Sequence, residues 1–196
     1  MQVTTLSFGN MHNHGELFVN LLRARHETFV ERNKWDLPTA DGMEFDQYDT
    51  PASRWVCVHE FGRVLAGVRL TPTTARVGIY SYMIRDAQRG LLPTIPETLL
   101  FEEAPVADHV WESSRVFVTE AVPAKLRMRV QMSLIGEMVR AARELGATSV
   151  LGLVPENSRR LARRTGIECV PAGPVLSFED ASPSVCVNIP MATKLH

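Results

Sequence analysis

Apolar residues recur along the first part of the chain with two different periods. From Gly15 to about Arg32 they follow helical spacing among charged residues, which predicts an amphipathic helix. In the segment RWVCVHEFGRVLAGVRLT they crowd and alternate instead, which predicts two strands joined by a turn at residues 61–63. We therefore expect a helix followed by a hairpin of two strands.

The second part of the chain has a stronger helical signal. Pro123 fits the first turn of a helix, where its missing N–H costs no hydrogen bond, and Gly146 is the expected end. The apolar stripe of this helix, at steps of four and three, comprises Met128, Met132, Ile135, Val139 and Ala142. The segments VWESSRVFV, SVLGLV and IECVPAGPVLSF predict strands, and a basic helix around ENSRRLARRTG is predicted to end at Gly166.

The order of these elements predicts the fold class. Strands interleaved with helices indicate an α/β protein, a three-layer αβα sandwich with a mixed, partly parallel sheet. The length of 196 residues suits one domain, spanning residues 1–196. Two long polar or proline-rich stretches, 34–53 and 72–109, predict loops, and loops of that length in a compact domain usually have a function.

Composition narrows the protein class. A formal net charge of -1, with 22% charged residues, argues against a dedicated nucleic-acid binder. The sequence contains no uninterrupted run of about 18 apolar residues, so no membrane span is expected. The first residues also lack the pattern of a signal peptide. Cys57, Cys169 and Cys186 form neither a disulfide framework nor a zinc pattern, so we expect a cytoplasmic protein. His12 and His14 fit a solvated terminus better than a metal site.

Charged and aromatic residues gather in the predicted loops and at the edges of elements. The group comprises Arg25, Phe29, Trp35, Asp46, Asp49, Arg69, Glu112 and Arg115. Each oppositely charged pair can be a surface salt bridge worth about 0–1 kcal/mol, and the aromatic residues can simply belong to the core. Alternatively, the group forms one site.

The order and spacing of these eight residues resemble those of the LuxI-type acyl-homoserine-lactone synthases, the enzymes that make bacterial quorum-sensing signals. The resemblance continues in the segment GATSVLGLVPENSRRLARRTGIECVPAGP and so covers most of the chain. It implies a fold similar to that of the GNAT N-acetyltransferases. It also implies that the α-amino group of S-adenosylmethionine attacks an acyl thioester of carrier protein or coenzyme A, after which the lactone closes and 5′-methylthioadenosine leaves.

The same resemblance implies roles in binding S-adenosylmethionine, which is a substrate, so no cofactor is expected. Trp35 and Phe29 are candidates to hold the sulfonium cation by cation–π contact. Arg25 or Arg69 would pair with the methionyl carboxylate. The carboxylates Asp46 and Asp49 are candidates to accept hydrogen bonds from the ammonium group.

Residues 112–115 would serve the acyl-transfer step. Glu112 is expected to act as the base, or to position the base, and Arg115 would hold it in place. Ser114 is a candidate to orient the thioester carbonyl. The alternative is that Glu112 and Arg115 form a partly buried ion pair that only fixes the strand.

The second half would hold the acyl donor. Met128, Met132 and Ile135 are candidates for an acyl tunnel, or are merely core. The basic residues Arg159, Arg160, Arg163 and Arg164 would dock an acidic carrier protein or a phosphopantetheine phosphate, or form a solvated helix face. Gly152 and Val154 stand where relatives acting on 3-oxo chains tend to have threonine, which favours an acyl group without that oxygen.

The sequence departs from the family pattern in two places. Gln88 stands where the family usually has a phenylalanine, and the stretch from Arg69 to Tyr82 is longer than usual. Both changes bear on substrate preference more than on reaction type.

Two other functions are possible alternatives. A GNAT-type N-acyltransferase using acyl-CoA would carry a glycine-rich turn before a helix to bind pyrophosphate, but the segment VPAKLRMRVQMSL has no glycine. A non-catalytic sensor of S-adenosylmethionine or an acyl ligand would keep the aromatic residues but need no base.

Overall fold

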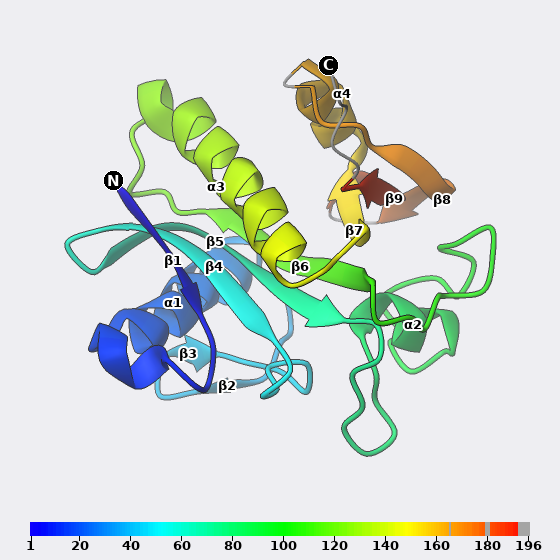
Figure 1. Cartoon of the computed structure of the whole chain (residues 1–196), viewed down its shortest axis with the longest axis horizontal. Coiled ribbons are helices and arrows are strands. Elements are labelled where there is room, and N and C mark those ends of the chain that lie inside the picture. Colours follow the sequence, from blue (N-terminus) through cyan, green and yellow to red (C-terminus); the bar gives the residue numbers. More distant parts are fainter. Residues whose placement is uncertain (165, 179–180, 192–196) are drawn as a thin grey trace. The chain divides into compact units, whose positions relative to one another are not determined.

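The computed structural model describes residues 1–164, 166–178 and 181–191 (Figure 1). In chain order the strands are β1 (Gln2–Leu6), β2 (Thr39–Ala40), β3 (Met43–Glu44), β4 (Arg54–Glu60), β5 (Arg63–Pro72), β6 (Val110–Val118), β7 (Ser149–Pro155), β8 (Val170–Phe178) and β9 (Ala181–Pro190). The helices are the 3-10 helix η1 (Met11–His14), α1 (Leu17–Arg25), the π-helix η2 (His26–Arg32), α2 (Met83–Gln88), α3 (Ala124–Glu144) and α4 (Glu156–Arg164). None of the helices in these described ranges combines the length and apolar character that a membrane crossing needs.

The chain divides into two compact units, each built from separate segments. Unit 1 comprises Met1–Leu70 and Arg115–Ala141, and unit 2 comprises Thr71–Ser114 and the described residues from Ala142 on. Each unit therefore takes part of β5 and part of β6. The single domain expected from the length stays a prediction.

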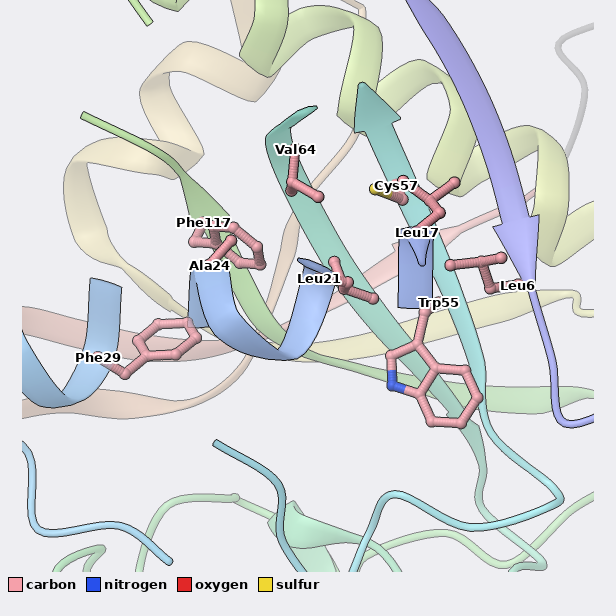
Figure 2. Packing of buried hydrophobic residues seen from close by; sticks show 9 residues of the cluster. All are labelled: Leu6, Leu17, Leu21, Ala24, Phe29, Trp55, Cys57, Val64 and Phe117. Atoms are coloured by element: carbon pink, nitrogen blue, oxygen red, sulfur yellow. The ribbon is translucent and has the colours of Figure 1, made fainter. Parts of the chain in front are cut away.

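Unit 1 is built on antiparallel strands in the order β1-β4-β5. The predicted turn between β4 and β5 is present, and Phe61 and Gly62 both have positive φ there. Side chains of α1, η2 and these strands form one apolar cluster, shown in Figure 2. Trp55 and Cys57 belong to this cluster, whereas Val56 and Val58, which alternate with them, are equally buried. Both faces of β4 are therefore covered, as in a layered sandwich.

Unit 2 contains strands in the order β6-β7-β9-β8. The pairing of β6 with β7 is parallel, in register from Val110 opposite Ser149 to Ser113 opposite Gly152. The β7–β9 and β9–β8 pairs are antiparallel. A second apolar cluster, which includes Tyr82, Ile84 and Leu151, joins α2 to these strands. The mixed pairing and the helices between strands confirm the predicted mixed α/β class.

The structure corrects the predicted stripe of α3. Its buried side chains are Val130, Leu134, Met138, Ala141 and Ala142. Met128 is 52% exposed, and Met132, Ile135 and Val139 are only partly buried. Two neighbouring apolar stripes share this helix, and periodicity alone does not say which of them packs inward. The end of the helix was predicted correctly, because Gly146 adopts φ 82° just beyond it.

Sequence reasoning missed several elements. The predicted first helix ends as an α-helix at Arg25 and continues as a π-helix to Arg32. Strands β1 and β9, the short helix α2 and the small β2–β3 hairpin were not predicted. The missed β2, β3 and α2 all lie in the two stretches taken as loops.

Gly67 on β5 lets α1 approach the sheet closely. A Cβ atom at this position would lie 2.8 Å from Leu21 Cδ1 and 2.8 Å from Phe117 Cε1. We expect Gly67→Ala to lower the free energy of unfolding by about 1–3 kcal/mol through overpacking. In contrast, Gly136→Ala on α3 meets no atom within 4 Å and should raise it by about 0.5–1 kcal/mol. Urea unfolding of both variants measures the difference, and equal effects would contradict this packing role.

Candidate active site

Six charged side chains of unit 1 form a closed ring in which arginines and carboxylates alternate. The order around the ring is Arg25, Glu44, Arg115, Asp46, Arg69, Asp49 and back to Arg25. Every carboxylate thus bridges two guanidinium groups. Five of these residues were predicted site residues, and Glu44 was not.

The contacts around the ring are short. Arg25 binds Asp49 with both terminal nitrogens, at 2.7 and 2.9 Å, and its Nε lies 2.6 Å from Glu44 Oε2. Arg115 donates to the other oxygen of Glu44 at 3.1 Å and lies 2.8 Å from Asp46 Oδ2. The ring closes through Arg69, which contacts Asp46 and lies 3.1 Å from Asp49 Oδ1. Bidentate pairs of this kind fix geometry as well as charge.

The side chains of the ring are almost completely buried from solvent. The side chains of Arg25 and Arg69 are 1% and 0% exposed, whereas Arg115 keeps 10%. Burial of an unpaired charge costs several kcal/mol, so such a site is stable only if charges balance. Three guanidinium groups face three carboxylates here, which provides that balance.

Asp49 has more partners than the other carboxylates. Besides the two arginines, it accepts hydrogen bonds from Trp55 Nε1 at 3.0 Å and from the backbone N–H of Asp46 at 2.8 Å. Burial by itself would raise the pKa of Asp49, but the charges of Arg69 and Arg25 outweigh it, and the pKa lies well below its usual range. Burial likewise acts to lower the pKa of Arg25, yet Asp49 outweighs this effect and raises it.

The predicted aromatic residues also come together. The rings of Phe29 and Trp35 stack, with centroids 5.1 Å apart and planes 12° from parallel. The guanidinium carbon of Arg115 lies 5.7 Å from the Phe29 centroid, and Phe117 packs edge-on against the same ring. Phe29 is buried in the cluster of Figure 2, whereas Trp35 is 43% exposed. Trp35 is therefore the member of the pair that solvent or a ligand reaches.

Arg115 has an unusual backbone. Its φ of 53° lies in the left-handed region, which is uncommon for a residue other than glycine and costs roughly 1–3 kcal/mol. In a regular strand, residues three apart point to opposite faces, and a left-handed residue interrupts that alternation. Strain of this kind persists only where surrounding contacts hold it, and two carboxylates hold Arg115.

Glu112 belongs to unit 2 and is fully buried. The backbone N–H groups at the start of α2 bind both of its oxygens, from Ile84 at 2.7 Å and from Met83 at 3.3 Å. Ser114, the predicted carbonyl-orienting residue, is also buried. Nothing in the sequence pointed to α2 as the element that holds Glu112.

The other predicted residues have mixed outcomes. Gln88 bridges α2 to the following loop, because its side chain donates to Glu102 O and accepts from Ala104 N, both at 2.8 Å. Arg159 is partly buried, but the side chains of Arg160, Arg163 and Arg164 lie outside the described residues. A Cβ atom on Gly152 would lie 2.6 Å from Ser113 Oγ, so a larger residue there would displace Ser113.

Glu44 tests the charge balance of the ring. We expect Glu44→Gln to lower the free energy of unfolding by about 3–5 kcal/mol, because Arg25 and Arg115 lose the charge they share. The matched control is Glu137→Gln on α3, which breaks an exposed pair with Arg140 and should cost at most about 1 kcal/mol. Equal losses in denaturant unfolding would show that the ring is no more than a set of surface salt bridges.

The low pKa of Asp49 makes stability depend on pH. A carboxyl whose pKa is lower in the folded than in the unfolded state stabilises the fold above its unfolded value, about 3.9. That stability is lost as the pH falls through the folded value. We expect the free energy of unfolding to drop steeply below about pH 4 and to drop less in Asp49→Asn. The exposed Asp36→Asn should keep the wild-type slope, and identical slopes in all three proteins would contradict the prediction.

Comparison with known proteins identifies related chains. Residues 10–181 match the family described as Autoinducer synthase. An acyl-homoserine-lactone synthase of Ralstonia solanacearum is 30% identical over 189 residues, covering 88% of this chain and 87% of that protein. One from Vibrio anguillarum is 29% identical over 178 residues, covering 89% and 86%.

Solved structures of related proteins are also similar to this chain. TofI, crystallised in a ternary complex with an inhibitor and MTA, is 27% identical, with a TM-score of 0.77 over 97% of this chain and 92% of that one. An acyl-CoA N-acyltransferase from Pseudomonas aeruginosa shares the fold at 17% identity, with a TM-score of 0.60 over 96% and 99%. The family match spans far more than half of the residues, so the chain belongs to the autoinducer synthase family.

Proposed function

We propose that this chain synthesises an N-acyl-L-homoserine lactone from S-adenosylmethionine and an acyl thioester. The observation that carries the proposal is the closed ring of charges, which draws five predicted site residues from distant parts of the sequence into one buried structure. Membership of the autoinducer synthase family supports the same reaction.

The chemistry determines what the site must do. The amine of S-adenosylmethionine attacks the thioester carbonyl, the C–S bond of the thioester breaks, and a thiol leaves. The methionyl carboxylate then attacks the carbon next to the sulfonium, which closes the lactone and expels 5′-methylthioadenosine. S-adenosylmethionine carries a net single positive charge and all three products are neutral, so each turnover releases one proton. The site therefore has to bind a cation, orient its carboxylate and accept a proton.

The ring suits the first two tasks as a rigid frame. Arg25 and Arg69 are buried and already bind ring carboxylates, so we assign them to the frame and not to direct contact with substrate. Arg115 is the least buried arginine of the ring, and we assign it to the methionyl carboxylate. The exposed Trp35 offers the sulfonium a ring face that Phe29 holds in place by stacking.

Glu112 suits the third task. Hydrogen bonds from α2 hold its carboxylate in one orientation, which is what a base, or a group that positions a basic water molecule, requires. The carboxylates of Asp46 and Asp49 already form ion pairs with arginines of the ring, so we assign them to the frame as well.

The same proposal extends to the cofactor requirement, the domain organisation and the compartment of the reaction. We propose that the substrates suffice without a cofactor and that the two units act as one catalytic domain in the cytoplasm. The three cysteines are free, and burial raises the pKa of the Cys57 thiol to about 12, which keeps it unreactive.

The test is turnover with a panel of thioesters. Purified protein is incubated with S-adenosylmethionine and acyl-carrier-protein or acyl-CoA donors, and lactone and 5′-methylthioadenosine are followed by mass spectrometry. Both products should appear together. Glu112→Gln should lower kcat by about 10²–10⁴-fold, and Trp35→Ala should raise KM for S-adenosylmethionine by roughly 2–30-fold.

Other outcomes point to other functions. Thiol release with transfer of the acyl group to another amine, and without 5′-methylthioadenosine, would indicate an N-acyltransferase. Binding of S-adenosylmethionine without turnover of any donor, unchanged in Glu112→Gln, would indicate a sensor. The exposed Trp35→Phe variant controls for folding, because it keeps an aromatic face.

A further inference from the structure

The turn between β5 and α2 in unit 2 carries exposed apolar side chains at its tip. Residues 77–80 close the turn through two backbone hydrogen bonds between Val77 and Tyr80, of 2.9 and 3.0 Å, and Gly78 has φ 59°. The side chain of Val77 is 45% exposed and that of Ile79 is 64% exposed. In Figure 1 the turn stands out from α2 as a narrow loop. Both apolar side chains are thus open to solvent, and the function proposed above gives them no role.

Arginines surround the base of this turn. Arg76 comes directly before it, and Arg85 and Arg89 belong to α2 or its end. All three line one hollow together with Ile79 and Tyr80. Arg89 also donates a hydrogen bond of 3.1 Å to Ile79 O. The apolar tip and the arginines are therefore parts of one surface.

The base of the turn is fixed by a buried carboxylate. Asp86 on α2 is fully buried and accepts hydrogen bonds from Ser81 N at 2.8 Å and Ser81 Oγ at 2.9 Å. It also pairs with Arg89 at 3.2 Å. A tip that is already held in one conformation binds a partner without the entropy cost of ordering a loop.

The charge around the tip is positive. In the part of the chain that the structure describes, the side chains that line the hollow include three arginines and no carboxylate. No described carboxylate lies within ion-pair distance of Arg76 or Arg85. This local excess of positive charge occurs on a chain whose formal net charge is -1. The surface therefore favours a partner that carries negative charge.

The shape of the surface indicates the kind of anionic partner. The apolar residues stand at the projecting end of the turn, and the arginines lie behind them. A partner protein would need a complementary pocket for such a tip, whereas the headgroup region of a bilayer is fluid and accepts it without one. Apolar side chains enter the boundary between headgroups and acyl chains, and basic side chains behind them contact anionic headgroups. The arrangement of this turn matches that order.

We propose that the turn at residues 77–80 docks the protein on a membrane surface that contains anionic lipids. Val77 and Ile79 enter the headgroup boundary, and Arg76, Arg85 and Arg89 contact the headgroups. The contact is with one surface of the bilayer. It does not depend on the reaction proposed above, so a binding measurement tests it directly.

The experiment is sedimentation of the full chain with vesicles of phosphatidylcholine alone or of phosphatidylcholine mixed with phosphatidylglycerol. The wild type should bind the anionic vesicles at least about tenfold more tightly than the neutral ones, and added salt should weaken this binding. A wild type that binds neither kind of vesicle, or binds both equally, would overturn the proposal.

Two double variants test the two parts of the surface. Val77→Ser/Ile79→Ser removes the apolar tip, and Arg76→Gln/Arg85→Gln removes two charges while Arg89 still holds the turn. Each should weaken binding to the anionic vesicles by about tenfold or more. A loss in only one of the two variants would overturn docking that uses both apolar insertion and charge.

Matched controls come from unit 1. Phe61→Ser removes a ring that is 98% exposed in the turn between β4 and β5. Arg23→Gln/Arg140→Gln removes two exposed arginines. Neither change should affect binding to the vesicles, and a loss equal to that of the tip variants would contradict the proposed surface.

A further variant separates insertion from damage to the turn. Ile79→Trp changes the side chain but keeps the tip apolar, and it should bind the anionic vesicles at least as tightly as the wild type, because tryptophan favours the membrane interface. Weaker binding by this variant would count against insertion. Thermal unfolding of each variant, expected to match the wild type, confirms that the fold is intact.

An acidic protein is the other class of partner that a basic surface could bind. If the vesicles are not bound, but acyl carrier protein is bound and is lost in Arg76→Gln/Arg85→Gln, the surface belongs to a protein partner and the membrane proposal is wrong.

Discussion

The alternation of charge around the ring of Arg25, Glu44, Arg115, Asp46, Arg69 and Asp49 is the constraint on which the site depends. Six charges removed from water are tolerated only because each has two neighbours of opposite sign. Removing one member leaves two partners uncompensated, so the ring acts as a unit. This explains why a buried glutamate sits in a two-residue strand such as β3, a position of no evident importance in the sequence. Without Glu44 the ring would have three positive and two negative members.

The ring also organises the chain around it. Its members come from α1, β3, the loop after β3, β5 and β6, so it holds in place a stretch that has little regular structure of its own. The approach of α1 to β5 depends on Gly67, and the left-handed backbone of Arg115 is held by Glu44 and Asp46. The long loop after η2 is therefore held by the ion pairs of Glu44, Asp46 and Asp49 as well as by the burial of Tyr48. A loop held in this way keeps a fixed geometry while Trp35 stays open to solvent.

The sequence predicted the parts of this molecule that follow from periodicity. Alternation identified β4 and β5, and proline and glycine marked the ends of α3. Charges placed at the edges of elements identified five ring members, but only as candidates. The sequence does not show which arginine pairs with which carboxylate. The structure gives Arg115 the partners Glu44 and Asp46, and its expected contact with Glu112 stays a prediction. The π-helix, the positive φ of Arg115 and the role of α2 depend on tertiary contacts, which no local pattern encodes. The inward face of α3 was misassigned because two apolar stripes of similar quality compete.

The burial of each charged or aromatic side chain limits the role that it can have in the site. Groups that are fully buried and fully paired fix geometry, whereas a group that binds a substrate must keep a free face. Arg25, Arg69, Asp46 and Asp49 are of the first kind. The exposed Trp35 and the partly exposed Arg115 are the groups that we propose to be of the second kind. Phe29 links the two kinds, because its buried ring contacts both Trp35 and Arg115. A change at Phe29 would therefore disturb both side chains that we propose to contact S-adenosylmethionine, although Phe29 itself is assigned no contact with the substrate. The same principle holds in unit 2, where the backbone N–H groups at the start of α2 fix the buried carboxylate of Glu112 in one orientation.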